Sequence, residues 1–334
     1  MLNYTLHENG WTILLGNFDF KNATQADADE IARLVSSNVA VVAQGSNIEN
    51  MTPEDQVRFC SMIGNLEEYH DDTAWGRAIA LSTDNIGNKI QRVTGAANDE
   101  GHPGLFGHDE ELDWHNNTPW DMRRKPAVFL KSISGAEGSR TSWTNTQSAY
   151  RDLKLEDPAF VQELEEQNYR VVCGWHKEGG HTTMYNYWHD QGHFPDEVES
   201  EETAMPLVFT NETGCKGFFL PYLQAHRLFG LTREESLPIL KRVWDYCLQE
   251  KYIYHHDWLP GGSEIVFAEQ WLSTHKRWEF DKMKTRFMER SAVDYVNTSW
   301  WPDVKKSFRK QITDIIRQNN VEMAERQMQQ IANL

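Results

Sequence analysis

Hydrophobic and polar positions along the chain follow a helical period in only a few segments. Thr24 can cap a helix at ADADEIARLVSS, and the following NVAVVAQG changes to β-branched residues that favour a strand. Thr52 and Thr232 each precede acidic residues and an amphipathic segment, which predicts two further capped helices. Residues 303–334 have the pattern of a helical tail. The predicted helices lie mainly near the ends of the chain and in two insertions.

Most of the remaining hydrophobic segments are short and bounded by turn residues, which predicts strands. They are AIALSTDN, KIQRVTG, PAVFLKSISG, RTSWTN, PLVFTN, GCKGFFL, SEIVFAEQ and TRFMERSAVDYV. A doubly wound α/β fold would have fewer strands. The pattern instead predicts an antiparallel barrel or sandwich with helices outside it.

A long polar stretch, about residues 175–204, has no clear period. It is too long for an ordinary connection, so we expect a lid or binding loop there. It contains His176, His181, His189 and His193, but their spacing matches no zinc signature and no cysteine joins them. We therefore expect these histidines to lie on the loop surface or to touch substrate, and not to bind a second metal.

Composition narrows the class of protein. The chain has 334 residues, of which 39% are hydrophobic, enough for a packed core in one large domain or two small ones. The net charge of −17 argues against nonspecific binding to nucleic acid or to an anionic membrane, because both need a basic face. Four well-separated cysteines without a CxxC pair fit a reducing compartment, and no signal peptide or membrane span is recognisable. We expect a cytoplasmic protein that acts on a small molecule, and a homo-oligomer is compatible with the sequence.

A His-x-Asn pair, His115 and Asn117, is the first candidate for chemistry. On a strand, residues i and i+2 point to the same side, so both side chains can reach one metal ion. Non-haem iron sites use two histidines and one carboxylate on one face of the metal, which leaves three positions for cosubstrate and oxygen. The second histidine would have to come from a distant strand. A His-x-Asn pair by itself is weak evidence for an iron site, because it also occurs by chance. The sequence around the pair makes the identification more specific.

Three segments around and after this pair carry a resemblance to a known family. They are ELDWHNNTPWDMRRKPAVFLKSISGAEGSRTSWTNTQSAYRDL, MPLVFTNETGCKGFFLPYLQAHRLFGLTREESLPIL and WLPGGSEIVFAEQWLSTHKRWEFDKMKTRFMER. In the same order they resemble the first metal motif, the PLV…ETG…GL…EES segment and the distal histidine–arginine motif of the taurine dioxygenase (TauD/TfdA) superfamily. The resemblance covers about residues 10–295.

The resemblance implies an α+β fold built on a double-stranded β-helix, a jelly-roll or cupin-like barrel, with flanking helices and a long insertion. Residues 1–302 would form the oxygenase domain, including the lid-like insertion at about 175–204. Residues 303–334 would form a C-terminal helical tail outside it. The resemblance also implies Fe(II) as the metal, 2-oxoglutarate as cosubstrate and O2 as oxidant.

The resemblance assigns roles to individual residues. His115 and His275 fall on the two iron histidines of the family. Thr141 and Arg286 fall on the residues that bind 2-oxoglutarate, and Arg290 falls on an arginine that in taurine dioxygenase holds the anionic group of the substrate. A planar guanidinium suits both arginine roles, because it binds an oxyanion with two donors.

Asn117 departs from the family, which has a carboxylate iron ligand at this position. Three interpretations are open. The amide oxygen can bind iron weakly, the position can be open to chloride as in halogenases of the wider superfamily, which have Ala or Gly there, or the residue can be a deliberate Asp→Asn change that inactivates the chain. The family's Asp-Asn pair before the distal histidine is Glu269-Gln270 here, a change that we expect to be structural.

Strand alternation places Glu111 and Asp113 on the same side as His115. These carboxylates would hold an ammonium group, and Arg290 the acid, of an amino-acid-like or other zwitterionic substrate. Asp113 can instead restore negative charge near the iron, or both carboxylates can form hydrogen bonds at the barrel rim. His70 lies near the position of a substrate-binding histidine of taurine dioxygenase, in a looser match.

The implied reaction is oxidative decarboxylation of 2-oxoglutarate to succinate and carbon dioxide, coupled to oxidation of a substrate C–H bond. Hydroxylation is the default outcome, and halogenation differs in the fate of the substrate radical. A binding scaffold of the same fold is the non-enzymatic alternative, and the retention of both histidines, the threonine and the arginine argues against it. A zinc hydrolase is a third class, for which the sequence has no suitable general base.

Overall fold

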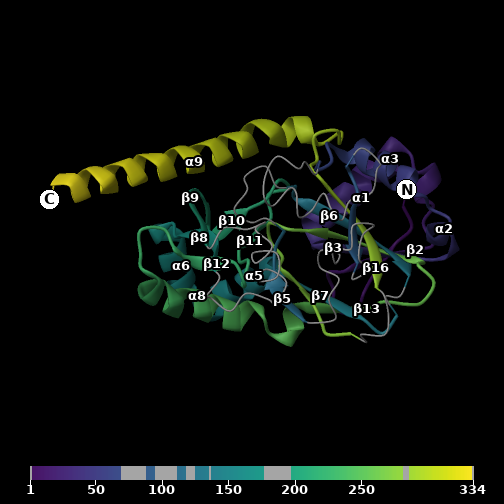
Figure 1. The fold of residues 1–334 in the computed structure, drawn as a ribbon, viewed down its shortest axis with the longest axis horizontal. Coiled ribbons are helices and arrows are strands. Elements are labelled where there is room, and N and C mark those ends of the chain that lie inside the picture. The colour runs from purple at the N-terminus through teal and green to yellow at the C-terminus, as the bar shows by residue number, and fades with distance from the viewer. Residues whose placement is uncertain are drawn as a thin grey trace.

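The computed structural model describes residues 2–68, 88–94, 111–117, 125–134, 137–176, 197–280 and 286–332 (Figure 1). The helices of this part are α1 (Gln25–Asn38), α2 (Ser46–Glu49), α3 (Pro53–Ile63), α5 (Thr146–Glu156), α6 (Pro158–Gln167), α8 (Arg233–Cys247) and α9 (Trp301–Ala332). The strands are β1 (Thr5–Leu6), β2 (Ile13–Gly16), β3 (Ala40–Gln44), β4 (Gln91–Thr94), β5 (Leu112–His115), β6 (Ala127–Ser134), β7 (Arg140–Thr144), β8 (Arg170–His176), β9 (Glu197–Pro206), β10 (Val208–Thr210), β11 (Lys216–Phe218), β12 (Ala225–Leu228), β13 (Ile253–Asp257), β14 (Glu264–Glu269), β15 (His275–Arg277) and β16 (Phe287–Val293).

The described strands form four sheets. A seven-stranded sheet has the order β1-β2-β3-β14-β6-β16-β4 and is antiparallel except for the β2–β3 pair. A four-stranded antiparallel sheet has the order β13-β7-β15-β5, and two smaller sheets are β12-β8-β9 and β10-β11. The predicted α+β class is confirmed. These strands close no barrel among themselves, so the jelly-roll arrangement stays a prediction.

Three helices begin where the sequence predicts. Thr24, Thr52 and Thr232 each accept a hydrogen bond from the backbone N–H three residues later, and the acidic residue there accepts from the threonine N–H. This reciprocal pair satisfies two backbone donors that have no partner inside the helix. Pro53 follows Thr52 in the first turn, where its missing N–H costs no hydrogen bond.

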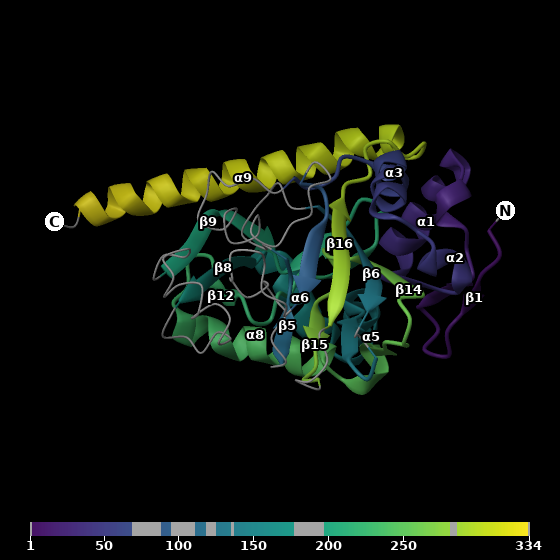
Figure 2. The same cartoon turned by 45° about the vertical axis from the view of Figure 1, so that its right-hand side comes forward.

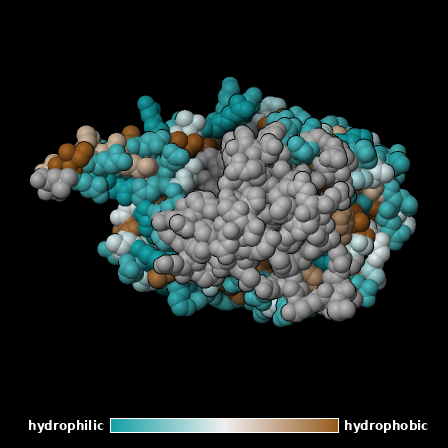
Figure 3. Space-filling model, viewed as in Figure 1, coloured by the Kyte–Doolittle hydropathy of each residue, from teal (hydrophilic) through white to brown (hydrophobic). Residues whose placement is uncertain are grey.

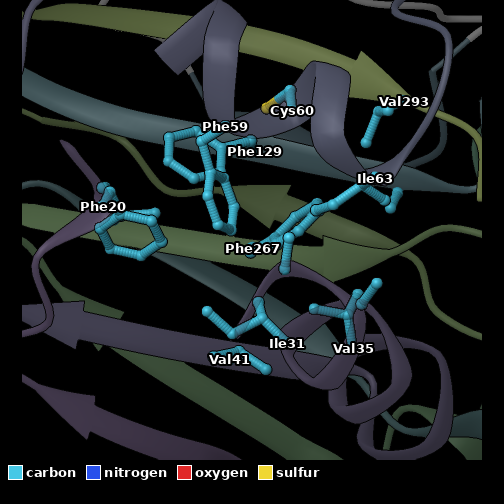
Figure 4. Close-up of a cluster of buried hydrophobic side chains, with 14 of the residues drawn as sticks. Phe20, Ile31, Val35, Val41, Phe59, Cys60, Ile63, Phe129, Phe267 and Val293 are labelled. Carbon is cyan, nitrogen blue, oxygen red and sulfur yellow. The ribbon is translucent and has the colours of Figure 1, made fainter. Parts of the chain in front are cut away.

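The outer face of the seven-stranded sheet is covered by α1 and α3. Ile265 and Phe267 of β14 pack there with Phe129 of β6 and with Phe59 of α3 (Figure 4). The rings of Phe20 and Phe59 meet edge to face with their centroids 4.9 Å apart. Full burial of each such side chain stabilises the fold by about 1.5–3 kcal/mol.

The inner face of the same sheet faces the four-stranded sheet. Val266 and Ala268 alternate with the outward residues of β14, and they pack with Trp143 of β7 and Tyr254 of β13. β14 is therefore buried on both faces. The layer between the two sheets also contains the cavity described below.

α9 connects two apolar clusters. Trp301 is buried in the cluster on the outer face of the large sheet, and Ile315 in a second cluster formed with α5, α6 and α8. Arg326 pairs with Glu201 of β9 at 2.6 Å. The helix runs along one side of the molecule (Figures 1 and 2), so the predicted tail is docked on the body and begins at Trp301.

The C-terminal end of α9 extends beyond the rest of the chain (Figures 1 and 2). Met328 and Ile331 there are 62% and 71% exposed, and apolar surface is visible at this end (Figure 3). No helix in the described ranges is long and apolar enough to span a bilayer. The division of the chain at residues 302 and 303 stays a prediction.

Two strands overlap the ends of the stretch at about 175–204 that was predicted to be a loop, chiefly at its C-terminal end. β8 extends to His176, and β9 covers Glu197–Pro206 in an antiparallel pair with β8. Residues 177–196, with the other three histidines of the stretch, lie outside the described residues. His70 and the strand predicted at 78–85 also lie outside them.

Candidate active site

A cavity lies between the two large sheets. Its walls come from β4, β6, β14 and β16 on one side and from β5, β7 and β15 on the other, with the residues next to them. The lining residues are Gln91, Val93, Leu112, His115, Asn117, Val128, Leu130, Thr141, Trp143, Val266, Ala268, His275, Arg277, Arg286 and Arg290. The fold thus brings the predicted metal-binding, cosubstrate-binding and anion-binding residues to one cavity.

His115 and His275 face each other on neighbouring strands. They are partners in the antiparallel register of β5 and β15, and their ring centroids are 4.2 Å apart. Nδ1 of His115 lies 2.6 Å from the carbonyl oxygen of Asp113. Because a carbonyl oxygen can only accept, Nδ1 carries the proton and Nε2 keeps its lone pair for a metal ion.

Burial keeps both imidazoles neutral. The pKa of His115 is lowered from its ordinary value of 6.5 to about 4, mainly because burial penalises the charged form. The pKa of His275 is well below 6.5 for the same reason, and the neighbouring His115 lowers it further. Neutral imidazole is the form that binds a metal ion.

The metal-free protein is expected to lose stability as the pH falls from about 6.5 to about 4. In this window the unfolded chain binds protons at histidine that the folded chain excludes, so acid favours unfolding, whereas above the window the contribution is constant. Thermal unfolding in the presence of a chelator measures the effect. His115→Gln removes one of the titrating groups and should reduce the pH dependence. An unchanged dependence in this variant would contradict the assignment.

Asn117 follows β5 and lines the same cavity. Its side-chain Nδ2 donates to Oε1 of Gln270 over 2.9 Å, and its backbone N–H donates to the same oxygen over 3.1 Å. No described residue donates to Oδ1 of Asn117, which leaves this oxygen available to a metal ion. Within the described ranges, no three His, Cys, Asp or Glu side chains gather into a metal site. Among the described residues that line the cavity, the two imidazoles and this amide oxygen are the donors expected from the sequence, and their chemistry fits Fe(II).

Arg286 and Thr141 form a second polar group in the cavity. Nη2 of Arg286 and Nε1 of Trp258 both donate to Oγ1 of Thr141, over 3.4 Å and 2.9 Å. Because this oxygen accepts from both, the threonine proton can be donated to an oxyanion. Arg286 is only 3% exposed, and no carboxylate of the described residues forms an ion pair with it.

The burial of Arg286 favours an anionic ligand. Its pKa is lowered to about 9 by burial and by the nearby charge of Arg277, so it remains cationic at neutral pH. A buried cation without a counter-ion is costly. A bound carboxylate would supply the counter-charge and accept from Thr141, which fits the distal carboxylate of 2-oxoglutarate.

Two more guanidinium groups line the cavity. Arg290 donates to Gln91 and, over 3.1 Å, to Oε2 of Glu67, so an acidic substrate would share it with Glu67. Arg277 is 7% exposed and is paired in register with Thr141. Arg277 and Gln91 were not predicted from the sequence, because the resemblance assigns no role to either residue and only the pairing of their strands places them at the cavity.

Glu111 and Asp113 do not line the cavity. The register of β5 on β15 shifts by one residue between His115 and Leu112, so the alternation along β5 is interrupted. Leu112 and His115 face the cavity, and both carboxylates pair instead with Nζ of Lys276, at 2.6 Å and 3.3 Å. The predicted placement of these carboxylates beside the metal is wrong, and the predicted ammonium pocket loses its support.

Solved structures share this architecture. A taurine dioxygenase from Burkholderia xenovorans superposes with a TM-score of 0.62 at 17% identity, over 84% of this chain and 85% of that one. The structure of AAD-2 in complex with Mn(II) and N-oxalylglycine gives a TM-score of 0.65 at 15% identity, over 87% of this chain and 97% of that one. The chain therefore has the fold of these dioxygenases.

Sequence comparison defines the family. The (S)-phenoxypropionate/alpha-ketoglutarate-dioxygenase of Sphingobium herbicidovorans is 26% identical over 188 residues, which are 54% of this chain and 62% of that protein. The chain thus spans less than two thirds of the length of this relative. The family model for the taurine catabolism dioxygenase TauD, TfdA family matches residues 7–292. The chain belongs to this family, and the resemblance of its motifs is confirmed.

Proposed function

We propose that the chain is an Fe(II)- and 2-oxoglutarate-dependent oxygenase that oxidises a C–H bond of a small organic acid. The supporting observation is that the neutral imidazoles of His115 and His275 line one cavity with the buried pair of Arg286 and Thr141. Iron held by the imidazoles and by the Asn117 amide oxygen would supply the oxidising chemistry with 2-oxoglutarate and O2. Arg286 and Thr141 would bind and orient the distal carboxylate of 2-oxoglutarate.

The cavity walls favour an acidic substrate with an apolar body. Val93, Val128 and Leu130 line the cavity together with Arg290. The related dioxygenase is named for (S)-phenoxypropionate, a carboxylate joined to an apolar group, which has the same two chemical features. An amino-acid-like substrate is not favoured, because the carboxylates predicted to hold its ammonium group pair with Lys276.

Hydroxylation is the outcome that we propose for the substrate. A halide would need the space at position 117, and the Asn117 side chain fills that space. Its hydrogen bond to Gln270 holds it there. Halogenation is therefore not favoured by the side chains around the proposed metal position.

Anaerobic titration tests this function. Adding Fe(II) and 2-oxoglutarate should produce a weak metal-to-ligand absorption band in the green region, and admission of oxygen should then yield succinate. The Asn117→Asp variant separates the remaining interpretations of this residue: a large gain in succinate would identify Asn117 as an inactivating change, and little gain would support a functional amide. Absence of both the band and oxygen-dependent succinate would contradict the proposed function.

A further inference from the structure

We propose that Gln270 is a positioning residue that makes position 117 specific for an amide, and that it orients the Asn117 amide oxygen as a metal ligand. This inference rests on the proposed metal site and deepens it. From the sequence alone, Gln270 is expected to be only a structural replacement for a family asparagine. In the structure it is the hydrogen-bond partner of the unusual residue in the metal-binding set.

The orientation of the Gln270 side chain is fixed by backbone groups. Nε2 donates to the carbonyl of Lys125 over 2.8 Å, and Oε1 accepts from the backbone N–H of Asn117 over 3.1 Å. The backbone of Gln270 is also held, by the carbonyl of Pro126 at 2.7 Å and by Nδ2 of Asn116 at 2.6 Å. Gln270 is 4% exposed. Since backbone N–H and C=O groups cannot exchange roles, they determine that Oε1 faces position 117.

An amide at position 117 fits this environment, and a carboxylate does not. Nδ2 of Asn117 donates to the acceptor that Gln270 presents, over 2.9 Å. A carboxylate oxygen in the same place would face another acceptor with no proton between them. Turning the Gln270 amide to supply a donor would place Nε2 against the N–H of residue 117 and Oε1 against the carbonyl of Lys125. Two buried hydrogen bonds would be lost, and unpaired buried groups are costly.

The same contact determines which atom of Asn117 can bind a metal. With Nδ2 engaged by Gln270, Oδ1 is the side-chain atom that remains for the metal ion. An amide nitrogen is not a useful ligand, so an amide that could turn would present the wrong atom part of the time. Gln270 therefore acts through Asn117, in the way that outer residues orient the ligands of other metal sites.

Mn(II) binding, followed by the electron paramagnetic resonance signal of the free ion, tests this role without turnover. Gln270→Leu should weaken Mn(II) binding about 10- to 100-fold, the usual effect of removing a group that orients a ligand. Gln270→Glu keeps an acceptor for Nδ2 and should bind Mn(II) at least as tightly as the unchanged protein. Thermal unfolding establishes that both variants are folded. Equal weakening in both variants would overturn the positioning role.

A double-mutant cycle separates positioning from a general effect on the fold. In the Asn117→Ala background, Gln270→Leu should have no further effect on Mn(II) affinity, because the group that Gln270 orients is absent. An additive loss would overturn the inference. The substitution Asn117→Asp should increase the Mn(II) affinity in both backgrounds. The increase should be about tenfold larger in the Gln270→Leu background than in the unchanged protein, because Oε1 of Gln270 no longer opposes the carboxylate.

Equal gains in the two backgrounds would overturn the amide specificity. If no substitution at Asn117 changes Mn(II) binding, Asn117 is not a ligand and the inference fails. Oxygen-dependent succinate formation would still decide the oxygenase activity separately, because it does not depend on which atom completes the metal site.

Discussion

Arg286→Gln is expected to raise the 2-oxoglutarate concentration for half-saturation about 100-fold, because removing one partner of a buried charge pair costs about 2–5 kcal/mol. The variant removes the cation that would meet the distal carboxylate, and it leaves Thr141 as the only member of the pair. The metal ligands are not changed. Anaerobic titration with 2-oxoglutarate at saturating Fe(II) gives the apparent affinity directly.

Arg140→Gln is the matched control for this substitution. Arg140 precedes Thr141 on β7, but it is exposed and pairs with Asp257 on the surface. The same chemical change there should leave the affinity for 2-oxoglutarate unchanged. Similar affinities in the Arg286 variant and in the control would show that Arg286 does not bind the cosubstrate.

His275→Ala is expected to remove measurable Fe(II) or Mn(II) binding. Loss of a direct ligand should exceed the roughly 10- to 100-fold effect of losing an outer residue, and the site has no charged ligand to compensate. The fold should survive, because the lowered pKa of His275 leaves the imidazole neutral and its replacement removes no charge from the folded protein at neutral pH. Metal titration together with thermal unfolding measures both effects.

His255→Ala is the control for the histidine variant. His255 lies on β13 of the same sheet, where its ring contacts Ser142 and Glu250 and does not line the cavity. Metal affinity should be unchanged in this variant. Retention of full metal affinity after His275→Ala would exclude His275 as a ligand.

Local signals in the sequence predicted much of the fold. The threonines at positions 24, 52 and 232 predicted the starts of their helices, because each caps its helix by a hydrogen bond to a backbone N–H three residues later. Such a contact is local in sequence and needs no distant partner. The short apolar run in SEIVFAEQ likewise predicted β14, and the structure places Phe267 and Val266 of this strand on opposite faces. The metal and cosubstrate residues were placed by the resemblance of their motifs, and the cavity unites them.

Features that depend on distant strands could not be predicted in this way. The register shift in β5 arises from its pairing with β15, and it moves Glu111 away from the cavity. β9 has the polar sequence EVESEETAMP without a hydrophobic period, and its pairing with β8 and the ion pair between Glu201 and Arg326 of α9 hold it in place. Gln270 became significant only when the structure placed it against Asn117.

The position of β14 has a consequence for the synthesis of the chain. This strand, Glu264–Glu269, lies between β3 and β6, which precede it by more than a hundred residues. A nascent chain that has not yet grown past Glu269 has no strand to place there, so β3 and β6 keep unpaired edges that can bind other chains. His275 and Arg286 follow this strand directly in sequence. Closure of the central sheet and assembly of the candidate cavity therefore both wait for the segment that begins with β14, and pairing across such sequence distances is slow.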